Sequence, residues 1–153
     1  MLKDILSIGG YSGLYKFVSQ GRNGIIVESL DTKQRMNAHA TSKISALEDI
    51  AIFTYEEDIP LKDVFKKISD KENGQESINH KSSANELKSY MSEVLPEYDE
   101  DKVYVSDIKK LISWYNILQK YNLLDFTKEE EEKDSKDDEE TAENVKENEE
   151  NKD

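Results

Sequence analysis

The sequence predicts an α+β protein, in which a small antiparallel SH3-like β-barrel is followed by a short helical C-terminal unit and a disordered acidic tail. Three observations in the 153-residue chain support this class. Between residues 14 and 55, apolar residues alternate with polar ones or form short β-branched runs, which is typical of strands. After Pro60 the apolar spacing changes to three and four residues, which is typical of amphipathic helices. From Thr127 onward the chain has no aromatic residue and one aliphatic residue larger than alanine, so it cannot form a core.

The clearest strand pair surrounds a short glycine-containing break at residues 20–24. Leu14–Ser19 and Ile25–Ser29, on its two sides, are rich in β-branched and aromatic residues. Gly21 and Gly24 adopt positive φ at low cost, so a tight reversal is expected between the two runs. This pattern predicts a β-hairpin.

Further short strands are expected on both sides of this hairpin. Ile5–Ile8 is a short apolar opening, either a strand or a helical turn, which ends at two glycines. Gln34–Ala40 alternates apolar and polar residues and predicts a half-buried third strand. Thr41–Asp49 predicts a turn or a short 3₁₀ piece. Ile50–Tyr55 is strongly β-prone and is expected to be a fourth strand of the same small sheet.

Three helices are expected in the second half of the chain. The first follows Pro60 and ends near Asp70, because Pro is well tolerated at a first helical position and four apolar residues then recur at helical spacing. The second begins at Ser83, where a capping box is expected, and stops at Pro96. The third is expected to start with Ser106 as its N-cap. The first helical stripe consists of Leu61, Val64, Phe65 and Ile68.

These patterns divide the chain into four parts. Residues 1–70 are expected to form the small β-barrel with its closing helix, and residues 71–82 a polar linker. Residues 83–126 form a helical hairpin domain, and residues 127–153 the disordered acidic tail.

The charge is distributed unevenly along the chain. The net charge is −13 in total; the tail carries fourteen acidic and five basic residues, so that the other 126 residues have a net charge of −4. A mildly acidic body does not favour general affinity for phosphate backbones, which needs clustered cations. The chain has no cysteine, no signal-peptide pattern and no apolar run of membrane-spanning length, so a soluble cytoplasmic protein without membrane contact is expected.

No catalytic or metal-binding pattern stands out. The two histidines, His39 and His80, have no serine, aspartate or second histidine at a recognisable motif spacing. Catalytic centres bring acid, base and nucleophile together, and metal sites need several converging ligands. The glycines match no phosphate-binding loop. The sequence therefore favours a protein that is not an enzyme and has no catalytic, metal or cofactor site.

Two places are candidates for binding. The first is a basic and aromatic surface of the barrel, suited to stacking on bases or to holding a peptide in an aromatic groove; its alternative is that the two aromatic residues are core and the cations are solvated. The second is Trp114 in the last helix, since aromatic residues anchor many protein contacts; its alternative is packing within its own domain. The first surface consists of Tyr15, Phe17, Arg22, Lys33, Arg35 and His39.

Four segments together resemble a known family. They are GLYKFVSQGRNGIIVESLDTKQR, SALEDIAIFT, IPLKDVFKKI and VYVSDIKKLISWYNIL. The combination is similar to a family of small bacterial proteins of unknown function, typical of the Bacteroidetes, over about residues 1–126. The resemblance implies an N-terminal SH3-like or small-barrel domain followed by a helical C-terminal domain. It implies no activity and assigns no role to any residue.

The function expected from the sequence is a non-enzymatic interaction module that binds a protein or peptide partner through the barrel or the helical hairpin. The alternative is an RNA- or ribosome-associated factor that uses Arg22, Lys33, Arg35 and Lys43. An enzyme with unrecognised residues is a third alternative. The acidic tail is a solubilising extension, or an electrostatic lure for a basic partner, or a self-competitor that occupies the barrel's cations.

Overall fold

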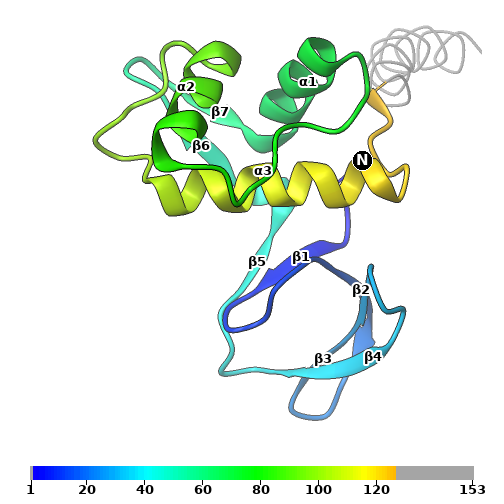
Figure 1. Cartoon of the computed structure of the whole chain (residues 1–153). Helices are drawn as coiled ribbons and strands as arrows, with labels where there is room; N and C mark the ends of the chain where they lie inside the picture. Colours follow the sequence, from blue (N-terminus) through cyan, green and yellow to red (C-terminus); the bar gives the residue numbers. More distant parts are fainter. Residues whose placement is uncertain (1, 127–153) are drawn as a thin grey trace, which may run out of the picture. The chain divides into compact units, whose positions relative to one another are not determined.

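The computed structural model describes residues 2–126, and their helices and strands confirm the α+β class (Figure 1). A five-stranded antiparallel sheet has the order β4-β3-β2-β1-β5, and a separate two-stranded sheet consists of β6 and β7. The elements are β1 (Ile5–Ile8), β2 (Tyr15–Gln20), β3 (Gly24–Ser29), β4 (Arg35–His39), β5 (Ile44–Ala46), a 3₁₀ turn (Leu47–Asp49), β6 (Ala51–Phe53), β7 (Asp58–Pro60), α1 (Leu61–Glu72), α2 (Ala84–Val94) and α3 (Val105–Lys120).

The predicted hairpin at residues 20–24 is confirmed as β2 and β3. Its register places Tyr15 opposite Ser29, and it shifts between Phe17 and Ser19, as at a β-bulge. Gly24 is required by a close approach rather than by its φ, because a Cβ at this position would overlap the backbone carbonyl of Ala38 on β4. The SH3-like closure of this sheet stays a prediction.

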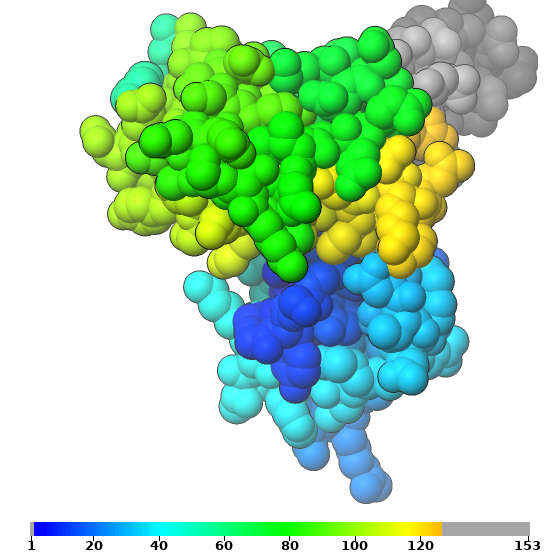
Figure 2. All heavy atoms as spheres, in the orientation of Figure 1, coloured from blue at the N-terminus to red at the C-terminus, as the bar shows by residue number. Residues whose placement is uncertain are grey.

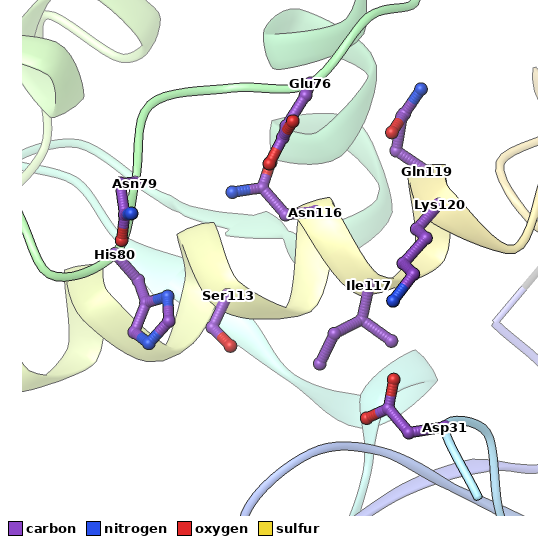
Figure 3. A pocket seen from close by; sticks show the side chains of 9 residues that line it. All are labelled: Asp31, Glu76, Asn79, His80, Ser113, Asn116, Ile117, Gln119 and Lys120. Atoms are coloured by element: carbon purple, nitrogen blue, oxygen red, sulfur yellow. The ribbon is translucent and has the colours of Figure 1, made fainter.

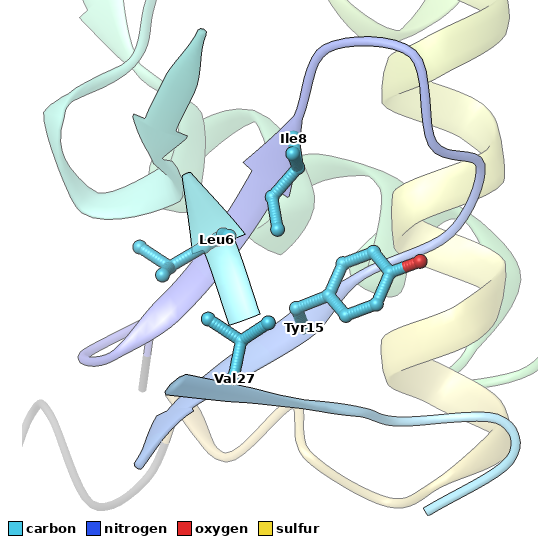
Figure 4. Packing of buried hydrophobic residues seen from close by; sticks show 5 residues of the cluster. Leu6, Ile8, Tyr15 and Val27 are labelled. Atoms are coloured by element: carbon cyan, nitrogen blue, oxygen red, sulfur yellow. The ribbon is translucent and has the colours of Figure 1, made fainter. Parts of the chain in front are cut away.

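The five-stranded sheet encloses an apolar cluster on one face. Figure 4 shows Leu6, Ile8, Tyr15 and Val27, which come from three different strands and pack against one another. Each of the four is at most 8% exposed. The alternation predicted for the third strand is confirmed in β4, where Ala38 is buried with this cluster and the charged and polar positions face solvent.

One strand prediction is wrong: the run from Ile50 does not join the five-stranded sheet. It forms β6, which pairs with β7 so that Ala51 lies opposite Pro60. The reason is a tight turn directly after β6, where the amide of Thr54 donates to the carbonyl of Glu57 at 3.1 Å. The chain therefore reverses directly after β6, and the backbone groups of this run pair with β7 instead of the larger sheet. In the larger sheet the neighbour of β5 is β1.

The helices begin close to the predicted positions, with one exception. Ser83 caps α2 as expected, since its hydroxyl accepts the amide of Glu86 at 3.2 Å. Helix α3 begins at Val105, so Ser106 is already inside it and the predicted N-cap is wrong. The free amide of Tyr104 is satisfied by a carboxylate from within the helix, because Asp107 Oδ2 accepts it at 3.0 Å.

A second core lies among the helices. The rings of Phe65 on α1 and Tyr115 on α3 have centroids 6.2 Å apart. The predicted apolar stripe of α1 is confirmed, because its four members are at most 1% exposed. The stripe of α3 is buried as well and consists of Ile108, Leu111, Ile112, Tyr115 and Leu118.

The segment that joins α1 to α2 is polar but held in place. Asn116 on α3 accepts both the amide of Ser77 at 2.9 Å and its hydroxyl at 2.7 Å. The same side chain donates its Nδ2 to the carbonyl of Ile78 at 3.0 Å. One amide side chain therefore fixes a stretch of this connection on α3.

The predicted acidic tail, residues 127–153, lies outside the described residues. In the part of the chain from residue 2 to 126, no helix combines the length and apolar character needed to cross a membrane.

Candidate functional site

The strand β6 has one edge paired with β7 and one edge open. On the paired edge, the amide of Leu61 donates to the carbonyl of Ile50 at 2.9 Å, and Ile52 lies opposite Ile59. Hydrogen-bonded positions alternate along an antiparallel strand. The backbone groups of Ala51 therefore point away from β7.

The same alternation turns the backbone of Phe53 toward the open edge. Its carbonyl accepts the amide of Asp99 at 2.9 Å, which uses one of the edge groups. The N–H and C=O of Ala51 and the N–H of Phe53 then face outward, and no strand within residues 2–126 pairs with them. Both side chains are exposed, whereas Ile52 between them is buried. An open edge of this kind is a template for another extended chain.

Helix α3 forms the opposite wall of a groove along this edge. Residues 107, 110, 111 and 114 share one face of the helix, because they are three and four positions apart. Trp114 is half-buried there. The hollow has a volume of about 230 Å³. We call it the β6–α3 groove; its lining residues are Ile50, Ala51, Ile52, Phe53, Lys102, Val103, Asp107, Lys110, Leu111 and Trp114.

Three charged side chains line the β6–α3 groove. The Lys102 ammonium lies 5.5 Å from the centre of the Phe53 ring, a cation–π distance. The Asp107 carboxylate is engaged with the backbone at the start of α3. Lys110 is exposed, and neither lysine has an ion-pair partner among the described residues. The lining is thus net positive in a body whose net charge is −4.

The two aromatic residues of the predicted barrel surface lie in or against the sheet core. Tyr15 is 8% exposed and belongs to the cluster of Figure 4, and Phe17 packs against that cluster. Both rings pack in or against the core, which is the alternative to a binding surface that the sequence left open. Tyr15 is therefore withdrawn from solvent, whereas Phe17 remains partly exposed.

Two other residues of that surface come together. Arg22 and His39 line one wide hollow of about 790 Å³ at the β2–β3 hairpin and the segment after β4. Both are exposed, and Figure 2 shows the tip of this hairpin, in mid-blue, projecting from the surface. Its lining has no phenylalanine, tyrosine or tryptophan, so the His39 imidazole is its one aromatic ring. This hollow offers the Arg22 guanidinium, that imidazole and backbone groups.

The remaining cations of the predicted barrel surface lie elsewhere. The Lys33 ammonium sits 4.9 Å from the centre of the Tyr121 ring, and Arg35 Nε is 3.6 Å from a carboxylate oxygen of Glu28. Arg35 and His39 stand at the two ends of β4, roughly 13 Å apart at the strand rise per residue. The structure therefore divides the predicted surface into separate places.

A polar hollow of about 550 Å³ beside α3 is shown in Figure 3. It holds charges of both signs, with Asp31 facing the side where Lys120 points. Asp31 accepts the hydroxyl of Tyr121 at 2.7 Å, so its carboxylate is already bound. His80 lines the other end. Within residues 2–126 no three histidine, aspartate or glutamate side chains are grouped as metal ligands.

The clearest pKa shifts belong to tyrosines of the helical part. Burial raises the pKa of Tyr90, and a hydrogen bond from its hydroxyl to Glu72 at 2.9 Å raises it further. Burial also raises the pKa of Tyr115, whose hydroxyl donates to the carbonyl of Gln75 at 2.8 Å. Both groups are kept neutral and serve packing; neither lines the β6–α3 groove.

The sequence identified Trp114 as a possible anchor but missed the strand edge opposite it. The sequence predicted residues 50–55 as a strand of the larger sheet, and so it missed their pairing with β7. The signal that was present is the shortness of the turn before Pro60, which favours a local hairpin. Lys102 and Lys110 gave no signal of their own, because isolated lysines on a solvated face are common.

The fold and the groove define a small α+β protein with a five-stranded sheet, a two-stranded sheet and three helices. Residues 2–47 match the family model described as Domain of unknown function (DUF5606), and residues 50–118 match Domain of unknown function (DUF6852). The β6–α3 groove lies wholly inside the second match.

A protein of known structure is similar over nearly the same length. It is a structural genomics target from Bacteroides vulgatus, determined by solution NMR, and it is 52% identical with a TM-score of 0.71. The similarity covers 82% of this chain and 91% of that chain. The chain belongs to this family of small bacterial proteins of unknown function, as the sequence resemblance predicted. Comparison with curated proteins finds no match.

Proposed function

We propose that the chain is a non-enzymatic interaction module that binds a protein partner by taking an extended segment of it as an added strand along β6. We also propose that the protein works in the cytoplasm, because a chain without cysteine suits a reducing compartment. Strand addition supplies affinity through main-chain hydrogen bonds and specificity through alternate side chains.

The single observation that supports this proposal is the open edge of β6. Two N–H groups and one C=O, from Ala51 and Phe53, face outward at a place where the wall is largely apolar. Backbone groups at such an edge exchange water for a partner strand without any rearrangement of the existing ladder. Leu111 and Trp114 across the groove offer an apolar contact to the same segment.

The test uses short random peptides displayed on phage and selected against the full chain. Selected peptides are synthesised, and their affinity is measured by fluorescence anisotropy. Binding is located by the shifts of backbone amide signals in NMR spectra. We expect the shifted amides to fall within residues 50–53 and 102–114. Shifts confined to other residues contradict the proposal.

A matched pair of edge variants makes the test specific. Ala51→Pro removes the outward N–H but spares the pairing with β7, because Ala51 makes no ladder bond to Pro60. Ala51→Ser keeps that N–H. We expect Ala51→Pro to weaken peptide binding about tenfold or more, since a bond is lost and the edge is blocked, and Ala51→Ser to bind as the parent. Equal binding by both variants refutes strand addition.

Binding measurements on the same protein and its variants also distinguish the RNA-associated alternative from the interaction module. Arg22 and His39 share a hollow, and this pairing of a guanidinium with an imidazole is the observation that favours RNA binding. Binding of single-stranded RNA that is lost on Arg22→Gln, with strong salt dependence, would support this alternative. Peptide binding that depends on Ala51 and is unchanged by Arg22→Gln supports the interaction module.

A further inference from the structure

The charges and spacing along α3 restrict what the β6–α3 groove accepts. Chain order places Lys102 before the start of α3, Lys110 in its first half and Trp114 one turn further on. Lys110 and Trp114 are four residues apart, which is about 6 Å along a helix axis. Alternate residues of an extended chain that share one face are about 6.6 Å apart. The spacing of Lys110 and Trp114 along α3 therefore matches the spacing of alternate side chains along an extended segment.

The charged residues that line the groove favour a negative charge on the segment that binds there. Asp107 is the acidic lining residue, and its carboxylate accepts the Tyr104 amide at 3.0 Å. Asp58 on β7 lies opposite Phe53, and Asp99 accepts the amides of residues 101 and 102. Two lysine ammonium groups remain without an ion-pair partner in residues 2–126, so a carboxylate on the incoming segment finds a cation within the lining itself.

We infer that the groove selects an extended partner segment in which an apolar residue and an acidic residue stand two positions apart. The apolar side chain packs on Trp114 and Leu111, and the carboxylate meets Lys110. A further acidic residue beyond it faces Lys102. This inference rests on the proposed function, because it assumes that the segment lies along β6.

A suitable probe has the sequence of residues 143–151, ENVKENEEN, used as a free synthetic peptide. It presents Val145 as the apolar residue, Glu147 two positions later and Glu149 beyond it. The receptor is the full chain with Val145→Ser, so that its own copy of the pattern does not compete. Comparison peptides carry either Val145→Ser or Glu147→Gln.

The expected result is saturable binding by the probe, with amide shifts in residues 50–53 and 102–114. Each comparison peptide is expected to bind more weakly. In the receptor, Lys110→Gln is expected to weaken binding about threefold, as for an exposed ion pair. The matched variant Lys109→Gln, one residue away and outside the lining, is expected to leave binding unchanged.

Three outcomes overturn the inference in different ways. Selected peptides that depend on the Ala51 edge but bind equally well after acidic residues are replaced leave strand addition standing and remove the charge preference. Absence of binding by both the probe and every selected peptide removes strand addition as well. Equal effects of Lys109→Gln and Lys110→Gln also contradict the inference, because they reduce the preference to overall charge.

Discussion

Replacing Asn116 by alanine tests whether one amide side chain holds the connection between α1 and α2. The wild-type side chain makes three hydrogen bonds, two from Ser77 and one to the Ile78 carbonyl, at 2.7 to 3.0 Å. Ser77 is 9% exposed, so its amide is not freely rehydrated after the change. The consequence is a loss of stability from a residue that contributes little to the apolar core.

The magnitude follows from these bonds. Each contributes about 1 kcal/mol net, so their loss costs about 3 kcal/mol. Alanine is the better helix former by up to about 0.7 kcal/mol, which returns part of the loss. We therefore expect Asn116→Ala to lower the free energy of unfolding by about 2 kcal/mol.

The assay is urea unfolding followed by far-UV circular dichroism. Asn85→Ala is the matched control, because Asn85 lies on an exposed position of α2, and it is expected to leave stability unchanged or to raise it by up to about 0.7 kcal/mol through helix propensity. Asn116→Asp keeps both acceptor bonds and loses the donor, so an intermediate loss is expected. A loss in Asn116→Ala no larger than that of the control refutes the reasoning.

Three further outcomes are expected. Gly24→Ala is expected to destabilise the fold by more than about 2 kcal/mol, because its Cβ would overlap the Ala38 carbonyl; a melting temperature equal to that of the parent contradicts this. Ser83→Ala is expected to cost about 1 kcal/mol in urea unfolding through loss of the α2 cap, and Ser83→Thr to retain most of it. The raised pKa of Tyr90 means that the folded state holds this proton more tightly than the unfolded chain, so stability falls as the pH rises above about 10. Tyr90→Phe is expected to flatten this fall, and an unchanged profile would count against the assignment.

The sequence predicted the strands and helices that depend on local pattern. The hairpin around Gly21 and Gly24, the four buried residues of α1 and the Ser83 cap were all visible as spacing or as a single residue type. These features are decided within a few residues of the chain, so periodicity and turn chemistry are sufficient to find them.

The parts that were wrong depend on competition between partners. The run from Ile50 is apolar enough for either sheet, and the turn at Thr54 decides for β7. At α3, Ser106 is a good cap by residue type, but Asp107 reaches back to the preceding amide and lets the helix begin earlier. In the first case the deciding contact is a hydrogen bond between two backbone groups, and in the second it is a hydrogen bond from a backbone amide to a carboxylate three residues on. Spacing of apolar residues reveals neither contact.

The candidate site was predicted only in part for the same reason. Trp114 was identified from its residue type and its divergence from Tyr115 on the helix. The edge of β6 is a property of pairing, and the separation of Arg22 and Arg35 is a property of strand ends. Neither can be derived before the topology is known.

The local pairing of β6 with β7 has a kinetic consequence. It joins Ala51 to Pro60, whereas the contact of β1 with β5 joins Leu6 to Ala46 across a much longer loop. Closing the longer loop costs about 1.3 kcal/mol more in chain entropy. The β6–β7 pair and the helix that directly follows it should therefore acquire protection before the β1–β5 pair in pulse-labelled refolding, and simultaneous protection of these two pairs would exclude that order.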